Sequence, residues 1–227
     1  MLETEEYVEV YSSVGTEMNQ QDCTDLIEQV IDHDNLYEAN RLVKANKGTA
    51  SVDGITVDQL FGHMKRYYQP LRRKLRDSIY RPQPVKRAYF PKEDGTKRKL
   101  GILSVLDRVV QQAIYQVMVK KIDPCFSKYS YGFRPKRNAK QATKQAARYY
   151  RQEYNVVVDC DLKSCFDTIN HKKSMEYVKV FIQDEVVLKL IWKFLRSGTM
   201  EDGLVSASES GAPQGGLCKA LHNPPYE

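Results

Sequence analysis

The residues whose types and spacing best suit phosphoryl-transfer chemistry lie between positions 156 and 171, in the run VVVDCDLKSCFDTINH. The β-branched valines predict a buried strand with Asp161 at its end, and Phe166 follows five residues later. Enzymes that transfer phosphoryl groups hold two magnesium ions about 4 Å apart on carboxylates at such rigid positions. An aspartate after a strand is equally typical of a polar turn, and alone Asp161 favours that simpler interpretation.

A second pair of candidate residues, Lys92 and Arg98, flanks the turn of a hairpin that we predict over residues 85–102. Asp94-Gly95 between the two arms is the usual signal for a tight hairpin turn. Such a hairpin can offer one cation from each arm to a single polyphosphate, and the arginine can bind two oxygens at once. Basic residues near a turn are more often a solvated face, so this pair is weak by itself.

Basic residues are concentrated in the segment that includes this hairpin. Residues 62–99 carry thirteen Lys and Arg against three acids, a net charge of +10, whereas residues 1–40 carry eleven acids and no Lys or Arg. Such a block attracts phosphate backbones through counterion release, and its interleaved tyrosines can stack on bases. A solvated surface is the alternative, and we favour nucleic acid over it. The candidate contacts in this block are Lys65, Arg66, Arg72, Arg73 and Arg87.

The elements that must position these residues follow from the spacing of apolar side chains. Ser104 and Asp107 have the spacing of a capping box and open a helix that closes at Asp123-Pro124. The strongest strand signal covers 155–162, and we expect that strand to be central in its sheet. Further helices are predicted over 22–45, from Thr56, and over 70–78, 138–150, 171–183 and 185–197, with a second hairpin turn at Asp202-Gly203.

Composition excludes several classes of protein. The five cysteines form no C-x-x-C pair, which indicates free thiols in a reducing compartment. The N-terminus is acidic and does not have the pattern of a signal peptide. The sequence has no apolar run of the roughly 18 residues that a membrane span needs. We therefore expect a cytoplasmic protein without a membrane partner.

The run at 156–171 resembles the first palm motif of reverse transcriptases, an Asp followed five residues later by Phe or Tyr. The resemblance implies that Asp161 is the catalytic metal ligand and that the Leu162 carbonyl also faces a metal. It implies that Phe166 lies under the nucleotide sugar and excludes a 2′-hydroxyl. Asp159 and Asp167 are off this pattern and are expected to be structural.

Other blocks resemble the same family in the same order. Residues 46–54 resemble an N-terminal motif of the group II intron branch, and residues 90–102 resemble the fingers hairpin, in which Lys92 and Arg98 would grip the triphosphate. This first block favours the group II intron branch over the retron branch. Each block is modest alone, but their order and spacing make a chance match improbable.

Two further blocks complete the resemblance. The segment SYGFRP at 130–135 is similar to a signature of the group II and retron branches and adds Arg134 to the expected nucleic-acid contacts. The segment GAPQGG at 211–216 resembles the motif whose glutamine, here Gln214, lies along the templating base pair and the nucleotide sugar.

The resemblance implies an α+β fold, with the fingers and an incomplete palm of a right-hand polymerase. The expected divisions are a tail and helical extension at 1–45, fingers at 46–153 and a partial palm at 154–227. The implied activity is RNA-directed DNA polymerisation with Mg²⁺. The implied partners are intron RNA, an RNA template, a DNA primer and deoxynucleoside triphosphates.

The pattern ends after Gly216, where the family continues into a hairpin that carries Tyr-Ala-Asp-Asp. This sequence has no two adjacent aspartates. Because a two-metal polymerase site needs about three carboxylates, we expect a truncated fragment that is inactive alone, or one complemented by a separate downstream palm and thumb fragment. The alternative is a maturase remnant that binds RNA without catalysis.

Overall fold

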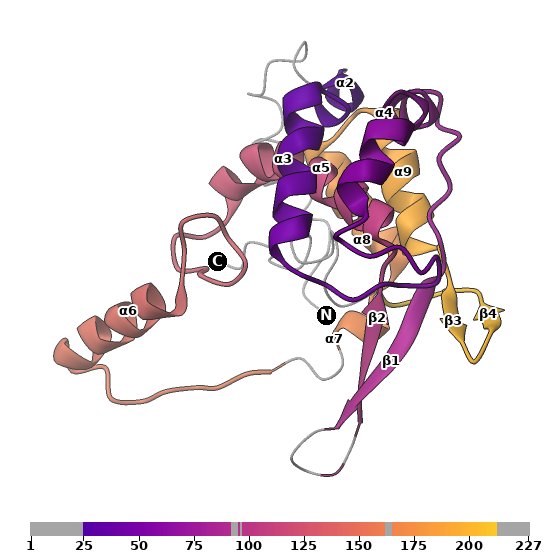
Figure 1. Ribbon diagram of the computed structural model, residues 1–227. Helices are drawn as coiled ribbons and strands as arrows, with labels where there is room; N and C mark the ends of the chain where they lie inside the picture. The colour runs from indigo at the N-terminus through magenta and orange to yellow at the C-terminus, as the bar shows by residue number, and fades with distance from the viewer. Residues whose placement is uncertain (1–24, 92–94, 96, 162–164, 213–227) are drawn as a thin grey trace.

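A computed structural model describes residues 25–91, 95, 97–161 and 165–212. A packed body holds most of the helices and a small sheet (Figure 1). An arm, residues 138–161, extends from this body and returns to it (Figure 1). Within the described residues, no helix is long and apolar enough to cross a membrane.

The core of the body is helical. Its buried apolar side chains come mainly from α2 (Leu26–Val30), α3 (His33–Ala45), α4 (Leu60–Arg76), α5 (Val105–Ile122), α8 (His171–Phe181) and α9 (Glu185–Leu195). Asp184 ties the first of these helices to the last. Its carboxylate caps α9 by accepting from the Val186 and Val187 amides at 2.8 and 3.1 Å, and it accepts from the Ile27 amide of α2 at 2.8 Å.

Two helix predictions need correction. The single helix predicted over 22–45 is two helices in the described residues, because Asp32 leaves the helical path and caps α3 by accepting from the Asp34 amide at 2.9 Å. The separate helices predicted from Thr56 and over 70–78 form one continuous helix, α4, with Pro70 inside it. Buried residues on both sides of that proline hold α4 against the core: Leu60, Met64, Leu71 and Leu75.

The predicted hairpin is confirmed as β1 (Val85–Pro91) and β2 (Lys97–Ile102), which pair in antiparallel register. The second turn is confirmed as well, because Asp202 and Gly203 join β3 (Thr199–Glu201) to β4 (Leu204–Ser206), both with positive φ. The four strands form a mixed sheet in the order β2-β1-β3-β4, in which β1 and β3 are parallel.

The strand predicted over 155–162 is wrong for the residues that the structure describes. Residues 154–161 form no ladder with any described strand, and Val156, Val157 and Val158 are 81%, 88% and 82% exposed. A β-branched run favours extended backbone, but a strand also needs a neighbour that pairs with its amides and carbonyls. The described sheet ends at β2 and β4, and neither edge strand pairs with this segment, so it is neither central nor paired.

The predicted cap of α5 is confirmed, since Ser104 Oγ accepts from the Asp107 amide at 3.1 Å. A short 3₁₀ turn, Asp123–Cys125, follows α5 where Asp123-Pro124 was predicted to close it. The helix predicted over 138–150 is α6 (Ala139–Arg151), which begins with a complete Asn138 and Gln141 capping box. Helix α7 (Cys165–Thr168) is a single turn.

Candidate nucleic-acid interface

Asp161, the predicted metal ligand, lies at the end of the extended segment of the arm and is exposed to solvent. The following residue, Leu162, falls outside the described part of the chain, and Phe166 lies in α7. No group of three or more His, Cys, Asp or Glu side chains that could hold a metal ion occurs among the described residues. Asp161 therefore belongs to no described group of carboxylates that could share a metal.

The segment after Phe166 is joined to the segment that leads to Gln214. The Gly211 amide donates to the Ile169 carbonyl at 2.9 Å, and the Gly211 carbonyl lies 2.6 Å from His171 Nε2. His171 is buried, and its ring meets Trp192 edge to face at 6.2 Å. These contacts hold the ends of the two motifs side by side, although Gln214 itself falls outside the described residues.

The register of the hairpin places Arg98 near its turn. Arg98 pairs with Phe90 and Lys97 with Pro91, so Lys92 is the next residue after the paired part of β1. Lys92 falls outside the described residues. The base of the hairpin is attached to β3, where Arg87 Nη2 lies 3.5 Å from Thr199 Oγ1.

The block at 46–54 is tied to the base of the same hairpin. Ser51 Oγ donates to the Ile102 carbonyl at 2.5 Å, and Arg108 donates to the carbonyls of Thr49 and Leu103. A Cβ on Gly48 would overlap the Arg108 guanidinium, so a larger residue would displace that side chain. Sequence reasoning did not identify Arg108, because no local pattern links it to residues 59 positions earlier.

Asp107 is a second residue whose role the sequence did not reveal. It is fully buried, and its carboxylate accepts from Ser104 Oγ at 2.7 Å, from the Tyr80 hydroxyl at 2.7 Å and from the Gln83 amide at 3.0 Å. Burial raises the pKa of Asp107, although these three donors act against the rise. The carboxylate thus fixes the chain just before β1 to the start of α5, and the cap spacing was the only sequence signal for it.

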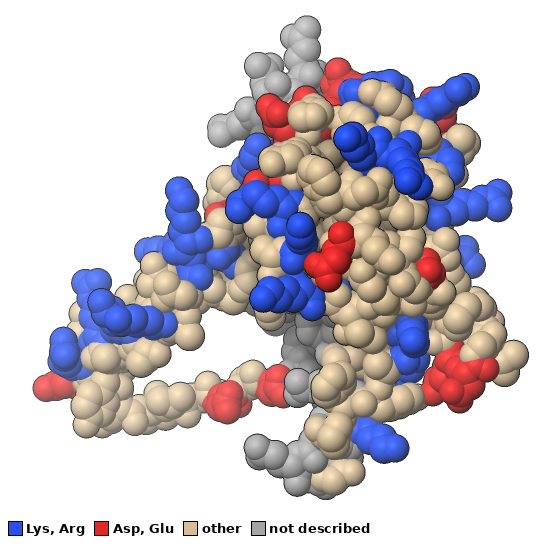
Figure 2. Space-filling model, viewed as in Figure 1, with Lys and Arg blue, Asp and Glu red and all other residues tan. Residues whose placement is uncertain are grey.

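Helix α4 presents the predicted basic contacts. Lys65, Arg66 and Arg73 are exposed, and Arg72 is half-buried with its guanidinium 5.6 Å from the Tyr68 ring. Lys and Arg side chains cover much of the region where α4 lies (Figure 2). Arg76 instead forms an ion pair within the protein, because it binds both carboxylate oxygens of Glu28 at 2.6 Å. That pairing lowers the pKa of Glu28.

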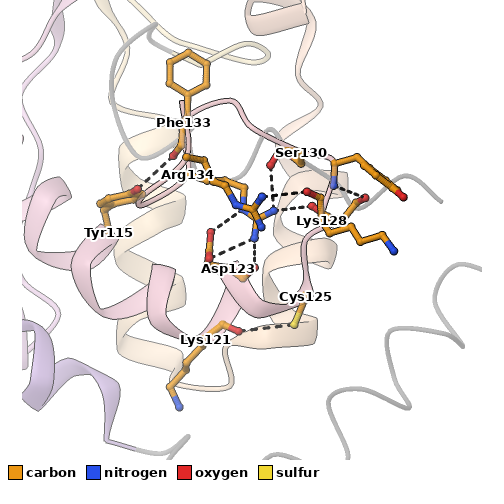
Figure 3. Close-up of polar contacts among 11 residues, drawn as sticks. Tyr115, Lys121, Asp123, Cys125, Lys128, Ser130, Phe133 and Arg134 are labelled. Atoms are coloured by element: carbon orange, nitrogen blue, oxygen red, sulfur yellow. Dashed lines mark hydrogen bonds and ion pairs between the residues drawn. The ribbon is translucent and has the colours of Figure 1, made fainter. Parts of the chain in front are cut away.

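The side chain of Arg134, in the SYGFRP segment, forms hydrogen bonds within the protein (Figure 3). Its side chain is 6% exposed, and Nε donates to Asp123 Oδ1 at 2.8 Å. Its Nη atoms donate to the carbonyls of Asp123, Ser127 and Ser130 at 2.8, 2.6 and 3.2 Å. A direct contact of Arg134 with a phosphate would require these bonds to break.

Residues 90–218, more than half of the chain, match the reverse transcriptase (RNA-dependent DNA polymerase) family. The chain belongs to this family.

Curated relatives connect the chain with group II introns. Protein YkfC of Escherichia coli (strain K12) is 35% identical over 192 residues, which cover 82% of this chain and 50% of that protein. The group II intron-encoded protein LtrA of Lactococcus lactis is 34% identical over 199 residues, which cover 87% of this chain and 33% of that protein. The chain thus spans between a third and a half of the length of these two relatives.

A solved structure has a similar fold. A chain of a partial Cas6-RT-Cas1–Cas2 complex superposes with a TM-score of 0.56 at 19% sequence identity, over 86% of this chain and 33% of that chain. At this identity the likeness concerns the fold alone.

Proposed function

We propose that the chain supplies the fingers, residues 46–153, and part of the palm, residues 154–227, of a group II intron-type RNA-directed DNA polymerase. We further propose that these 227 residues bind RNA but do not extend a primer by themselves. One observation carries the proposal: the stretch that matches the reverse transcriptase family contains every residue that we assign to nucleotide handling. These residues are Lys92, Arg98, Asp161, Phe166 and Gln214.

The roles follow from the chemistry of each side chain. Lys92 and Arg98, at the same end of the hairpin, bind the triphosphate of the incoming deoxynucleotide. Phe166 packs against its sugar and excludes a 2′-hydroxyl by bulk. Gln214 lies along the templating base pair. The Gly211 contacts to Ile169 and His171 support the nearness of the last two residues.

Magnesium is the metal that this family generally uses, and its role would be to stabilise the charge that develops on the transferred phosphoryl group. Asp161 and the Leu162 carbonyl would contribute to its binding. They do not make a complete site, because two metals need about three carboxylates and the described residues contain no such group. We propose that a separate palm and thumb fragment would have to supply the others.

The exposed bases of α4, Lys65, Arg66 and Arg73, are the proposed contacts for intron RNA or for the template and primer. Arg72 and Arg87, both half-buried, are further proposed contacts. Arg134 would act indirectly, by holding the loop in which it lies.

Binding to a labelled RNA at increasing salt tests the RNA-binding half of the proposal. We expect micromolar affinity, and an affinity that falls steeply with salt because each phosphate contact releases a counterion. The triple variant Lys65→Gln, Arg66→Gln, Arg73→Gln should lower the slope of log affinity against log salt by about 2. A control that removes equal charge from α8, Lys172→Gln, Lys173→Gln, Lys179→Gln, should change it little. Affinity that does not depend on salt would contradict the proposal.

The catalytic half is tested by primer extension. The 227 residues alone, with Mg²⁺ and deoxynucleotides, should give no product, and fusion to the palm and thumb of a relative should restore extension. In that fusion, Arg98→Ala should mainly raise the apparent KM for nucleotide, because a triphosphate contact is lost. Template-dependent extension by the chain alone that disappears in Asp161→Ala would contradict the proposal.

A non-catalytic maturase remnant is the second candidate function. The observation that favours it has two parts. Helix α4 presents exposed bases, and the described residues contain no group of three or more side chains that could hold a metal ion. A fusion that remains inactive, together with salt-dependent RNA binding by the chain alone, would support this alternative.

A further inference from the structure

A second basic surface lies on the loop 126–137 and on α6, outside the block at 62–99. Residues 126–151 carry eight Lys and Arg and no acid. Because 3.6 residues make one helical turn, positions 140, 144, 148 and 151 share one side of α6. Lys140, Lys144, Arg148 and Arg151 therefore form a continuous basic stripe along the helix.

These bases are available to a ligand. All four are exposed, and α6 buries none of its described residues. No ion pair within the described residues includes any of the four. In Figure 2 blue side chains cover the part of the arm in which Figure 1 shows α6. A fold that needed α6 only for packing would not leave the whole helix in solvent.

Exposed aromatic rings lie on the loop and on the flanks of α6, where Tyr149 and Tyr150 are each about 100° around the helix from the neighbouring base. Tyr129 of the loop is 52% exposed, and Tyr150 of α6 is 74% exposed. The Tyr129 ring lies 6.2 Å from that of Tyr149, which meets Tyr154 edge to face at 5.8 Å. Lys128 lies over the Tyr129 ring at 5.1 Å. Exposed rings with adjacent cations are the components of surfaces that bind single strands, where bases stack on rings and phosphates meet cations.

The loop that carries Tyr129 is rigidly held. Arg134 binds the carbonyls on both sides of the tyrosine, those of Ser127 and Ser130, and Arg137 donates to the Lys128 carbonyl at 3.1 Å. The Tyr115 hydroxyl of α5 donates to the Phe133 carbonyl at 3.4 Å (Figure 3). The loop therefore presents its ring without a large cost in ordering on binding.

We propose that the basic stripe of α6, together with Tyr129, Tyr149 and Tyr150, is a second nucleic-acid surface and that it binds single-stranded RNA. The inference rests on the proposed function only in taking RNA as the ligand. Single strands fit better than duplexes, because a duplex keeps its bases stacked inside and leaves the tyrosine rings without partners. The phosphates lie along the stripe, and unpaired bases stack on the rings.

The test measures anisotropy of a labelled oligouridylate, and of an RNA duplex of equal length, with the 227-residue chain. The variant Lys140→Gln, Lys144→Gln, Arg148→Gln should weaken oligouridylate binding about 10-fold and lower the salt slope by about 2. The α8 triple variant described above is its matched control and should change both much less. Because all six substituted side chains are exposed, the thermal unfolding of both variants should match the parent.

Tyrosine variants separate stacking from simple charge attraction. Tyr150→Ala should weaken oligouridylate binding about 5-fold and leave duplex binding unchanged. Tyr177→Ala, which removes a ring that is 51% exposed from α8, should change neither. Equal losses for the α6 and α8 triple variants, or for Tyr150→Ala and Tyr177→Ala, would overturn the inference and leave the arm as a surface for protein packing. The α4 variant would still report on the proposed function, so the two can fail separately.

Discussion

The body and the arm differ in which kinds of side chain they bury. Asp107 is polar yet completely buried in the body, and Val157 is apolar yet 88% exposed in the arm. Three donors converge on the Asp107 carboxylate, whereas no described strand pairs with the backbone around Val157. The difference teaches that burial depends on the partners that a segment finds, and side-chain polarity alone does not decide it.

The same contrast separates residues that hold the fold from residues that carry the proposed chemistry. Asp107 connects the segment before β1 to α5 and is inaccessible to substrate. Asp161 is exposed in the arm, and its side chain forms no hydrogen bond or ion pair with another described residue. Substituting Asp161 should therefore lower primer extension and spare stability, whereas substituting Asp107 should lower stability.

The largest expected effect comes from the arm. In the fusion to a related palm and thumb, Asp161→Asn should lower primer extension by at least about 10³-fold, because an amide cannot replace the charge that binds the metals. Its melting temperature should equal that of the unsubstituted fusion. A parallel loss of extension and of thermal stability would show that Asp161 is part of the fold.

The next effect comes from the body. Asp107→Ala should lower the free energy of unfolding by about 3 kcal/mol, because three buried or half-buried donors lose their acceptor. Asp159→Ala in the arm is the control, and its effect should stay within about 0.5 kcal/mol. Denaturant titrations of the 227-residue chain measure both, and equal effects would remove the contrast between the two regions.

The pH dependence sharpens the assignment of Asp107. Burial raises the pKa of this carboxyl above its ordinary value, so the folded state holds its proton to higher pH than the unfolded state does. The stability that this proton contributes is present below about pH 4 and is lost as the pH rises through the folded pKa. The stability of the parent relative to Asp107→Asn should therefore fall over that range. A relative stability that rises with pH would contradict the raised pKa.

The smallest expected effects come from a comparison of two valines, one in the body and one in the arm. Val109→Ala on α5, where the side chain is fully buried, should cost about 2 kcal/mol through a lost contact and a cavity. Val157→Ala should cost less than about 0.5 kcal/mol, since its side chain is already in solvent. Comparable costs, measured in the same denaturant titration, would indicate that the arm packs against the body in solution.

Sequence reasoning succeeded where the signal is local. The Asp94-Gly95 and Asp202-Gly203 turns, the Ser104 cap and the end of α5 all depend on residues within a few positions of one another. The family assignment is equally well founded, because its motifs are short and ordered along the chain.

It failed where the outcome depends on distant partners. The valine run indicated a central strand, but whether it pairs is decided by strands elsewhere, and no described strand pairs with it. The motif around Arg134 was identified, but not the way its guanidinium is enclosed by Asp123 and the carbonyls of Ser127 and Ser130. The roles of Lys92, Arg98, Phe166 and Gln214 stay predictions, because the structure does not describe these side chains.

The central claim, that residues 90–218 handle the incoming nucleotide of a reverse transcriptase, is tested most directly at Phe166. The measurement is the ratio of deoxynucleotide to ribonucleotide incorporation by the fusion with and without Phe166→Ala. If the ring excludes the 2′-hydroxyl, the substitution should lower this ratio by at least about 10-fold while the fusion stays folded. A folded variant whose ratio is unchanged would contradict the claim, since a ring that only packs would affect stability and not the choice of sugar.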